Sequence, residues 1–131
     1  MKNFRLQIIT PERLFFDKDV YMAEFNTTEG ELGVYADHIP LTCILSPGVL
    51  TIRMDGEEKE AALHSGFVEI LPDKVTILAE AIEWPEEIDE ARAEAAMARA
   101  KERIAHPNSQ TDIARAQTAL MRAMARITVI K

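Results

Sequence analysis

The sequence predicts an α+β protein, with an antiparallel β-sandwich or barrel in its N-terminal part and an antiparallel pair of helices in its C-terminal part. Apolar and polar residues alternate with a period of two up to Glu83, which is typical of half-buried strands. Residues 88–131 contain no glycine and one proline, and they are rich in alanine, arginine, glutamate and methionine, which favour helix. The change of pattern falls at Trp84-Pro85, so we divide the chain into residues 1–85 and residues 86–131.

The expected strands are short and are separated by residues that favour turns. Asp55-Gly56 follows one apolar run and Pro72-Asp73 separates two others, so both pairs are expected to form hairpin turns. Many short strands at this spacing are typical of an antiparallel sandwich or barrel. The clearest expected strands are residues 4–8, 20–23, 41–45, 49–54, 66–71 and 74–78.

Two helices of about 18 and about 20 residues are expected after Pro85. Glu86 and Glu87 place negative charge where the N-terminus of a helix favours it. The segment His-Pro-Asn-Ser at residues 106–109 interrupts the helical pattern, and Ser109 is a candidate N-cap of the second helix. Because this break is short, the helices are expected to form an antiparallel hairpin.

Two arrangements of this hairpin relative to the strands remain open. Few contacts need to cross Trp84-Pro85, so the hairpin could move as an arm, or it could be packed against the strands. The expected seam between the helices is rich in alanine and buries little area, so the arm should need the strands, a partner or a ligand to hold one conformation. The seam consists of Ile88, Ala91, Ala95 and Ala98 in the first helix and Ile113, Ala116, Leu120, Ala123, Ile127 and Ile130 in the second.

Charge is distributed unevenly along the chain. The formal net charge is −7, but residues 1–85 carry 15 acidic and 7 basic side chains, whereas residues 86–131 carry 7 acidic and 8 basic ones. A basic C-terminal part on an acidic body suggests an acidic partner, such as nucleic acid, an acidic protein surface or a nucleotide phosphate. Nucleic acid is disfavoured by the negative net charge, the lack of lysine clusters and the 6% aromatic content.

No catalytic or metal-binding pattern is visible in the sequence. His38, His64 and His106 are scattered and lack the spacing of metal ligands, so no metal site is expected. Cys43 lies in an apolar strand, where a small buried side chain is a better interpretation than a nucleophile. There is no Gly-Lys phosphate loop and no nucleophile elbow, so an enzyme is the least favoured class and no catalytic residue is assigned.

Six arginines form two matching rows in the C-terminal part. Asp89-x-x-Arg92-Ala93 recurs as Asp112-x-x-Arg115-Ala116 with an offset of 23 residues. Arginines spaced by seven and four residues lie on nearly the same side of a helix. The ordinary interpretation is a solvated face with Glu–Arg pairs, but the second helix has almost no acids, which favours anion binding. The rows are Arg92, Arg99 and Arg103, and Arg115, Arg122 and Arg126.

Several motifs together resemble the epsilon subunit of rotary ATP synthases. The chain has Phe-Arg-Leu-Gln-Ile-Ile-Thr-Pro-Glu at residues 4–12 and a Gly-Glu-Leu-Gly turn followed by His-Ile-Pro within residues 28–41. Leu-Ser-Pro-Gly-Val-Leu at residues 45–50 and Ser-Gly-Phe-Val-Glu-Ile at residues 65–70 follow in the expected order. Tyr35-Ala36-Asp37 departs from the family, where many members have Leu-Pro-Gly. The resemblance covers essentially the whole chain.

This resemblance implies a sandwich of about ten strands and a helical hairpin. It also implies a non-catalytic central-stalk subunit at the cytoplasmic face of the cell membrane, which is peripheral and reaches the membrane only through the complex. The implied partners are the gamma subunit, the membrane rotor ring and the alpha and beta subunits of the catalytic hexamer. Glu31 and His38 would lie near the rotor ring, and Arg103 and Arg115 would face an acidic loop of the beta subunit. The extended arm would inhibit ATP hydrolysis.

Some bacterial members of that family bind one ATP on the folded arm, and this chain has their complete Ile-Asp-x-x-Arg-Ala motif. The resemblance therefore implies no required cofactor but ATP as a regulatory ligand. A carboxylate can accept from the adenine amino group, and guanidinium groups suit phosphate oxygens. The alternatives are that Asp89 only caps its helix and Arg92 pairs locally, or that the chain is a stand-alone ATP-binding sensor module. The implied nucleotide-binding residues are Glu83, Ile88, Asp89, Arg92, Ala93, Arg99, Arg122 and Arg126.

Overall fold

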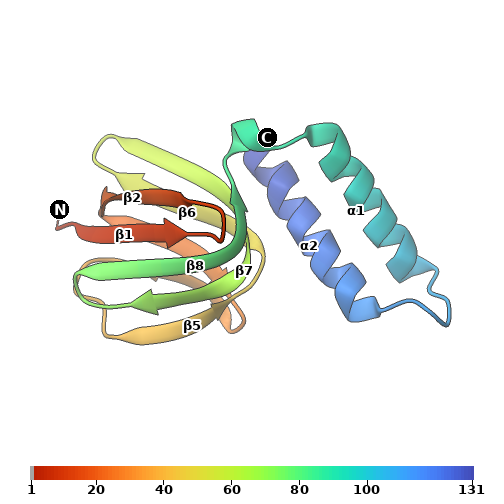
Figure 1. Cartoon of the computed structure of the whole chain (residues 1–131), viewed down its shortest axis with the longest axis horizontal. Coiled ribbons are helices and arrows are strands. Elements are labelled where there is room, and N and C mark those ends of the chain that lie inside the picture. The colour runs from red at the N-terminus through yellow and green to blue at the C-terminus, as the bar shows by residue number, and fades with distance from the viewer. Residues whose placement is uncertain (1) are drawn as a thin grey trace.

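Strands form the N-terminal part of the molecule and helices the C-terminal part, as Figure 1 shows. The computed structural model describes residues 2–131. The prediction of a β-sandwich followed by a two-helix hairpin is confirmed. The elements are β1 (Phe4–Ile9), β2 (Leu14–Val20), β3 (Met22–Thr27), β4 (Gly30–Val34), β5 (Leu41–Leu45), β6 (Gly48–Met54), β7 (Glu57–Ile70), β8 (Lys74–Glu83), the 3-10 turn η1 (Pro85–Glu87), α1 (Glu90–Ala105) and α2 (Ile113–Ile130).

The strands pair in the order β2-β1-β8-β7-β5-β3-β4, and β6 pairs with both β3 and β7. The sheet therefore folds back on itself around one core. All pairs are antiparallel except β1 with β8, so the expected antiparallel sandwich contains one parallel pair. β1 and β8 come from opposite ends of the domain and share no hairpin, so no tight turn forces them to run antiparallel.

The described residues contain eight strands, whereas about ten were expected, and part of the difference is that β7 takes part in both layers of the sandwich. It is 14 residues long, pairs with β6 through its first half and pairs with β5 through its second half. The exchange of partners occurs at Ser65 and Gly66, whose φ angles are 49° and 129°. A Cβ atom at Gly66 would collide with the carbonyl oxygen of Leu78, so a glycine is required where the strand bends.

The core follows from the alternation that predicted the strands. In β1, Phe4, Leu6 and Ile8 are buried while Arg5 is exposed. β7 departs from this alternation at Ala61–His64, where four successive residues are buried. One face of β7 packs there against the sandwich core, and the other face is covered by α2, since Ala62 clusters with Ala125 and Val129 of that helix. The arm is therefore packed against the body, which settles for this structure the arrangement that the sequence left open.

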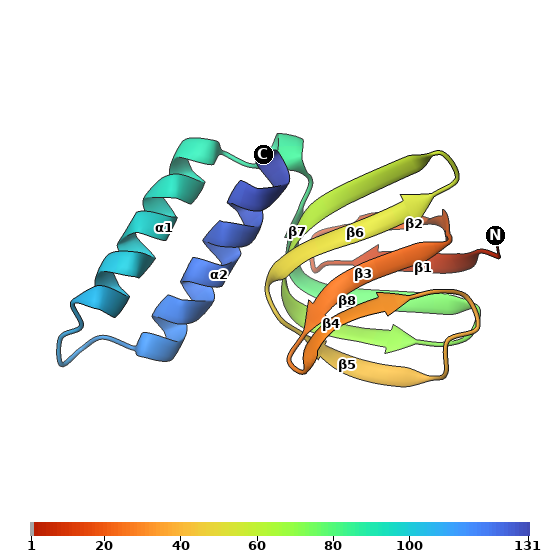
Figure 2. The same ribbon diagram turned by 180° about the vertical axis from the view of Figure 1, so that it is seen from behind.

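The second helix lies between the sandwich and the first helix, as both views of the ribbon show (Figures 1 and 2). α2 packs against β6 and β7. Among the strands and helices, α1 has extensive contacts only with α2. The apolar part of the contact with the body is small, since its buried members are Ala62, Ala125 and Val129 with Val49, Ile88 and Ile130 beside them. Such a small contact fits an arm that is only moderately held by apolar burial.

The two arm helices begin in the same way, which explains the weak repeat. Oδ1 of Asp89 accepts a hydrogen bond of 3.1 Å from the backbone N of Arg92, and Oδ1 of Asp112 accepts one of 3.0 Å from the backbone N of Arg115. Both aspartates are therefore N-caps. The expectation that Ser109 caps the second helix is wrong, because Asn108 and Thr111 close a turn around it through their side chains.

The helix seam differs in part from the expected one. In α1 the buried residues are Ala93 and Ala100, whereas Ala91, Ala95 and Ala98 are exposed. In a helix where nearly every apolar side chain is alanine, several stripes have similar hydrophobicity, so pattern alone selected the wrong one. In α2, Ala116 and Ala123 are buried as expected, Ile113 is exposed, and the contact with the body adds Ala125 and Val129.

Candidate functional site

A cavity of about 440 Å³ lies where the start of α1, the end of β8 and the second half of α2 meet. It gathers residues that are up to 43 positions apart in the sequence, such as Glu83 and Arg126. Seven of the eight predicted nucleotide-binding residues line it: Glu83, Ile88, Asp89, Arg92, Ala93, Arg99 and Arg126, together with Glu87, Ala95 and Ala96.

Glu83 forms the end of the cavity that belongs to the sandwich. Its Oε1 accepts a hydrogen bond of 2.7 Å from Nε of Arg126 and one of 2.8 Å from Nε2 of His64. Burial by itself would raise the pKa of Glu83, but the hydrogen bonds from Arg126 and His64 outweigh burial and lower the pKa below its ordinary value. Glu83 is therefore an ionised acceptor at neutral pH, held between β7 and α2.

His64 is the buried partner that the sequence did not reveal as part of this site. Its side chain is 2% exposed, and burial lowers its pKa below the ordinary 6.5 despite the hydrogen bond to Glu83, with Arg126 and Arg122 acting in the same direction. A neutral imidazole beside a carboxylate donates from Nε2. The available signal was a histidine inside an apolar stretch, but this pattern does not say which carboxylate the ring meets.

Three arginines supply positive charge around the rest of the cavity. Arg126 is held by Glu83, whereas Arg92 and Arg99 on α1 make no ion pair within residues 2–131. The structure therefore does not show the local ion pair that one interpretation gave to Arg92. Asp89 does cap its helix. The cavity combines carboxylate acceptors, small apolar side chains and guanidinium donors, which suits a ligand with a hydrogen-bond-donating end and an anionic end.

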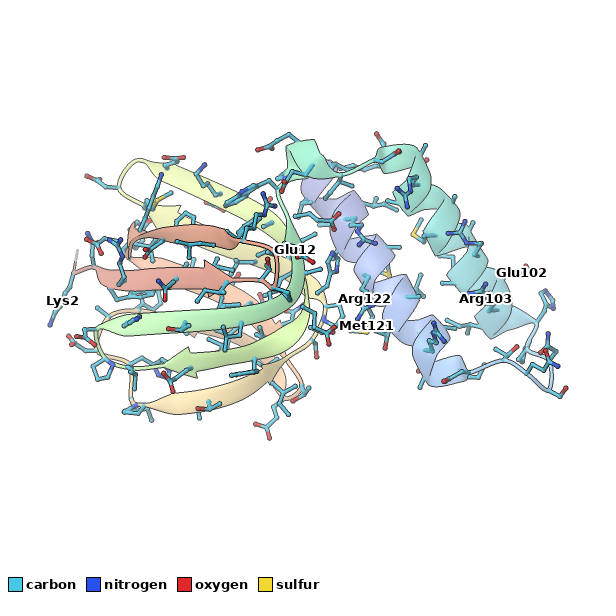
Figure 3. All side chains as sticks on the ribbon, viewed as in Figure 1. Lys2, Glu12, Glu102, Arg103, Met121 and Arg122 are labelled. Carbon is cyan, nitrogen blue, oxygen red and sulfur yellow. The ribbon has the colours of Figure 1, made fainter. Side chains whose placement is uncertain are left out.

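Arg122 is the predicted residue that this cavity does not include. It lines a second, more open cavity of about 960 Å³ near the turn between the helices, together with Arg103 and Arg115. Figure 3 shows Arg122 on α2 beside the strands and Arg103 on α1 toward the turn between the helices. Nη2 of Arg122 lies 3.3 Å from Oε2 of Glu80, so this side chain contributes a second polar contact between the arm and the sandwich.

The segment that joins the two parts of the chain is fastened to the sandwich. Nη2 of Arg13 lies 2.8 Å from both carboxylate oxygens of Glu87, and the backbone N of Trp84 donates to Oε1 of Glu87 at 2.9 Å. The Trp84 ring stacks on Phe15 with 4.3 Å between ring centroids. Trp84 and η1 are therefore fastened to the body.

Glu31 and His38, the expected rotor-ring contacts, do not lie together in one cavity. Glu31 lines a third cavity of about 440 Å³ between α2 and the strands, with Met121 and Met124 on its other side. His38 is half-buried in the loop before β5, and its Nδ1 lies 2.7 Å from the carbonyl oxygen of Ile39. Both side chains remain on the surface of the sandwich or its edge, where a partner can reach them.

A row of exposed apolar residues crosses the sandwich on a face that the sequence pattern did not single out. Ile44 is paired with Phe67, Phe67 with Leu78, and Leu78 with Ile9 on four adjacent strands. Leu14 of β2 continues the row opposite Ile9. Ile44, Phe67, Leu78 and Leu14 are 65%, 46%, 37% and 55% exposed, and Ile9 between them is half-buried. We name these five residues the apolar row. Contiguous exposed apolar side chains of this kind typically mark a protein interface.

Two further properties bear on the class of the protein. No helix within residues 2–131 combines the length and the hydropathy that a membrane-spanning helix requires. Among the same residues, no group of three histidine, cysteine, aspartate or glutamate side chains is arranged to hold a metal ion. Cys43 is half-buried, and burial raises the pKa of its thiol, which disfavours the reactive thiolate.

Comparison with known proteins gives matches along the whole chain. Residues 3–85 match the family model of the β-sandwich domain of the ATP synthase delta/epsilon chain, and residues 86–131 match the model of its long α-helix domain. The chain is 46% identical over 129 residues to the ATP synthase epsilon chain of Caldanaerobacter subterraneus subsp. tengcongensis, covering 98% of this chain and 94% of the relative. It is 41% identical to the epsilon chain of Bacillus velezensis, with 98% of each chain covered.

Solved structures with the same fold come from mitochondrial ATP synthases. A chain in the Euglena gracilis mitochondrial ATP synthase superimposes with a TM-score of 0.82 at 22% identity, covering 94% of this chain and 78% of that chain. A chain in the central stalk and c-ring structure of the Tetrahymena thermophila mitochondrial ATP synthase superimposes with a TM-score of 0.60 at 17% identity, covering 98% of this chain and 94% of that chain. At these identities the likeness concerns the fold.

Proposed function

The chain belongs to the ATP synthase delta/epsilon chain family, whose members are non-catalytic, and on that premise we propose that it is the epsilon subunit of the central stalk, with an arm that senses ATP and inhibits ATP hydrolysis. The sandwich connects the catalytic hexamer to the rotor ring, and the subunit is peripheral at the cytoplasmic face of the cell membrane. The arm lies against the sandwich when ATP is bound and extends toward the hexamer when it is not.

The observation that carries ATP sensing is the cavity shared by α1, α2 and the end of β8. The ionised carboxylate of Glu83 is the acceptor for the amino group of adenine, and Ile88 and Ala93 contact the base. Arg92, Arg99 and Arg126 bind the phosphates, for which guanidinium groups are well suited. Since these groups come from both helices and from the sandwich, a ligand that binds them stabilises the folded arm by mass action.

Arg122 joins this site only through a modest change of its side chain. In this structure it points to Glu80 and lines the neighbouring cavity. It lies four residues before Arg126 on the same side of α2, so a rotamer change brings a fourth guanidinium toward a bound triphosphate. Arg103 and Arg115 lie further along the hairpin, and we assign them to the acidic loop of the beta subunit that the extended arm meets.

The contacts of the sandwich follow from its surface. The apolar row offers the gamma subunit an exposed apolar strip across the outer side of five strands, which is the kind of surface that a permanent interface covers. Glu31 and His38 are assigned to the rotor ring. The alpha and beta subunits contact the arm only after it has left the sandwich.

A stand-alone ATP sensor is the alternative, and the fact that the whole cavity is formed within one chain favours it. Purification from the native membrane separates the two: a stalk subunit is recovered with the gamma subunit and the catalytic hexamer, whereas a sensor is recovered alone. The apolar row favours the stalk subunit, because exposed apolar side chains of this kind are typical of a protein interface and a sensor that acts alone has no partner to cover them.

Calorimetric titration of the full chain with ATP tests the nucleotide site. Wild type should bind one ATP, and Arg92→Ala and Arg126→Ala should each weaken binding by about tenfold or more, because each removes charge-assisted hydrogen bonds to phosphate. Lys101→Ala is the matched control, since Lys101 is exposed on α1 and does not line the cavity. Equal losses of ATP affinity in all three variants would show that binding depends only on net charge, and would refute the site.

A further inference from the structure

Two donors bind the same oxygen of Glu83, so the two carboxylate oxygens have different roles. Oε1 accepts from both Arg126 at 2.7 Å and His64 at 2.8 Å. Oε2 has no hydrogen-bond partner within residues 2–131, and Glu83 lines the cavity. A carboxylate with one oxygen occupied on the protein side keeps the other as an acceptor for a ligand. The orientation of Glu83 therefore depends on its two donors.

The two donors differ in how firmly they are held. Arg126 is 31% exposed and belongs to α2, so its contact with Glu83 exists only while the arm is folded. His64 is 2% exposed in β7, directly beside β8, and its contact lies within the sandwich. The hydrogen bond from His64 thus remains when the arm leaves, and it keeps Glu83 in the conformation that the arm and a ligand require.

We propose that His64 is a positioning residue that orients Glu83 so that the ATP site selects a base with an exocyclic amino group. Oε1 is fixed by His64 and Arg126, and Oε2 accepts from the amino group of adenine. Hypoxanthine carries a carbonyl oxygen in place of that amino group and would set an acceptor against an ionised carboxylate. The inference rests on the proposed ATP site and assigns its preference among bases to a residue in the sandwich.

His64 also makes the site sensitive to pH, because a second proton on its ring has no acceptor within residues 2–131. Nδ1 is buried there without a hydrogen-bond partner. The charged groups that face the ring are Glu83 from β8 and Arg122 and Arg126 from α2. A protonated ring would place a third cation beside the two arginines of the arm, so acid should drive α2 away from the sandwich and weaken ligand binding.

The test compares ATP with ITP on the full chain by calorimetry at about pH 7.5 and about pH 6. His64→Ala removes the donor, whereas His64→Gln keeps an N–H at a similar reach and cannot titrate. At the higher pH, wild type and His64→Gln should prefer ATP over ITP by a similar ratio, and His64→Ala should lower that ratio by about tenfold. Between the two pH values, wild type should lose affinity for ATP more steeply than His64→Gln does.

The outcomes separate this inference from the ATP site itself. A wild-type chain that does not bind ATP refutes both. ATP binding with an unchanged ATP-to-ITP ratio in His64→Ala refutes the role of His64 alone, and so does a His64→Gln variant that loses the ratio as completely as His64→Ala. If hydrogen exchange in the strands shows that His64→Ala is unfolded, the test relies on the pH dependence of ATP affinity. An equal loss of ATP affinity between the two pH values in wild type and His64→Gln would then overturn the proposal.

Discussion

The guanidinium group of Arg13 lies 2.8 Å from both carboxylate oxygens of Glu87, so the turn between β1 and β2 holds the segment that leads into the arm. The hydrogen bond from Arg13 is the main cause that lowers the pKa of Glu87. Together with the stacked Phe15 and Trp84, this contact fastens the chain to the sandwich as far as Glu87.

Breaking this contact should loosen the joint without unfolding the sandwich. In Arg13→Ala, amide exchange should become faster at residues 84–90, since Glu87 keeps only its hydrogen bond from Trp84. Lys2→Ala is the control, because it removes an ion pair with Asp37 elsewhere on the sandwich surface. Unchanged exchange at residues 84–90 in Arg13→Ala would show that stacking alone fixes the joint.

The apolar row should decide assembly with the gamma subunit. Phe67→Asp places a charge in the middle of the row, so recovery of gamma with the subunit should fall by about tenfold or more while thermal stability changes little, because Phe67 is 46% exposed. Lys18→Asp introduces the same residue at an exposed position of β2 outside the row. If both variants recover gamma equally, the assembly surface lies elsewhere.

Removing the arm should leave a folded sandwich that still binds gamma. The main core cluster consists of residues before Pro85, and the arm covers only a small area around Ala62. A chain ending at Glu87 should therefore unfold cooperatively, and a complex assembled with it should hydrolyse ATP faster than one with the full chain. Loss of gamma binding in the shortened chain would contradict this assignment of surfaces.

Stability should fall as the pH drops below about 6.5, the ordinary pKa of histidine. Because the pKa of His64 is lower in the folded chain, the unfolded chain takes up a proton first and acid favours unfolding. The loss is limited to about 1.4 kcal/mol for each pH unit from this one group. Thermal unfolding of wild type and His64→Gln at several pH values measures this loss. Parallel plots of stability against pH would show that other groups control the pH dependence.

The sequence predicted the architecture because strand and helix patterns are local, and it failed where tertiary packing decides. The break in alternation at residues 61–64 arises because α2 covers the outer face of β7, which no local pattern contains. The structure has eight strands where the resemblance implied about ten, in part because a bend at Ser65 and Gly66 lets one strand belong to two layers. In α1, alanines on several stripes are equivalent until α2 is in place, so the seam could not be chosen.

The candidate site was predictable to a different extent. Seven residues inferred from the resemblance line one cavity, although spacing alone could not show that α1 and the end of β8 meet. Arg122 pairs with Glu80 on the sandwich, a contact between distant parts of the chain that spacing along α2 does not reveal. A lone histidine in an apolar strand does not reveal its partner, so the role of His64 was not predictable from the sequence. Only the register that brings β7 beside β8 places it next to Glu83.

The central claim is that ATP holds the arm against the sandwich through groups from both helices. Hydrogen exchange of residues 88–131 in the full chain, measured with and without millimolar ATP (about 1 mM or more), tests it directly. Exchange should become slower along both α1 and α2 when ATP is present, and this protection should disappear in Arg126→Ala but persist in Lys101→Ala. Equal exchange with and without ATP in the wild-type chain would contradict the account.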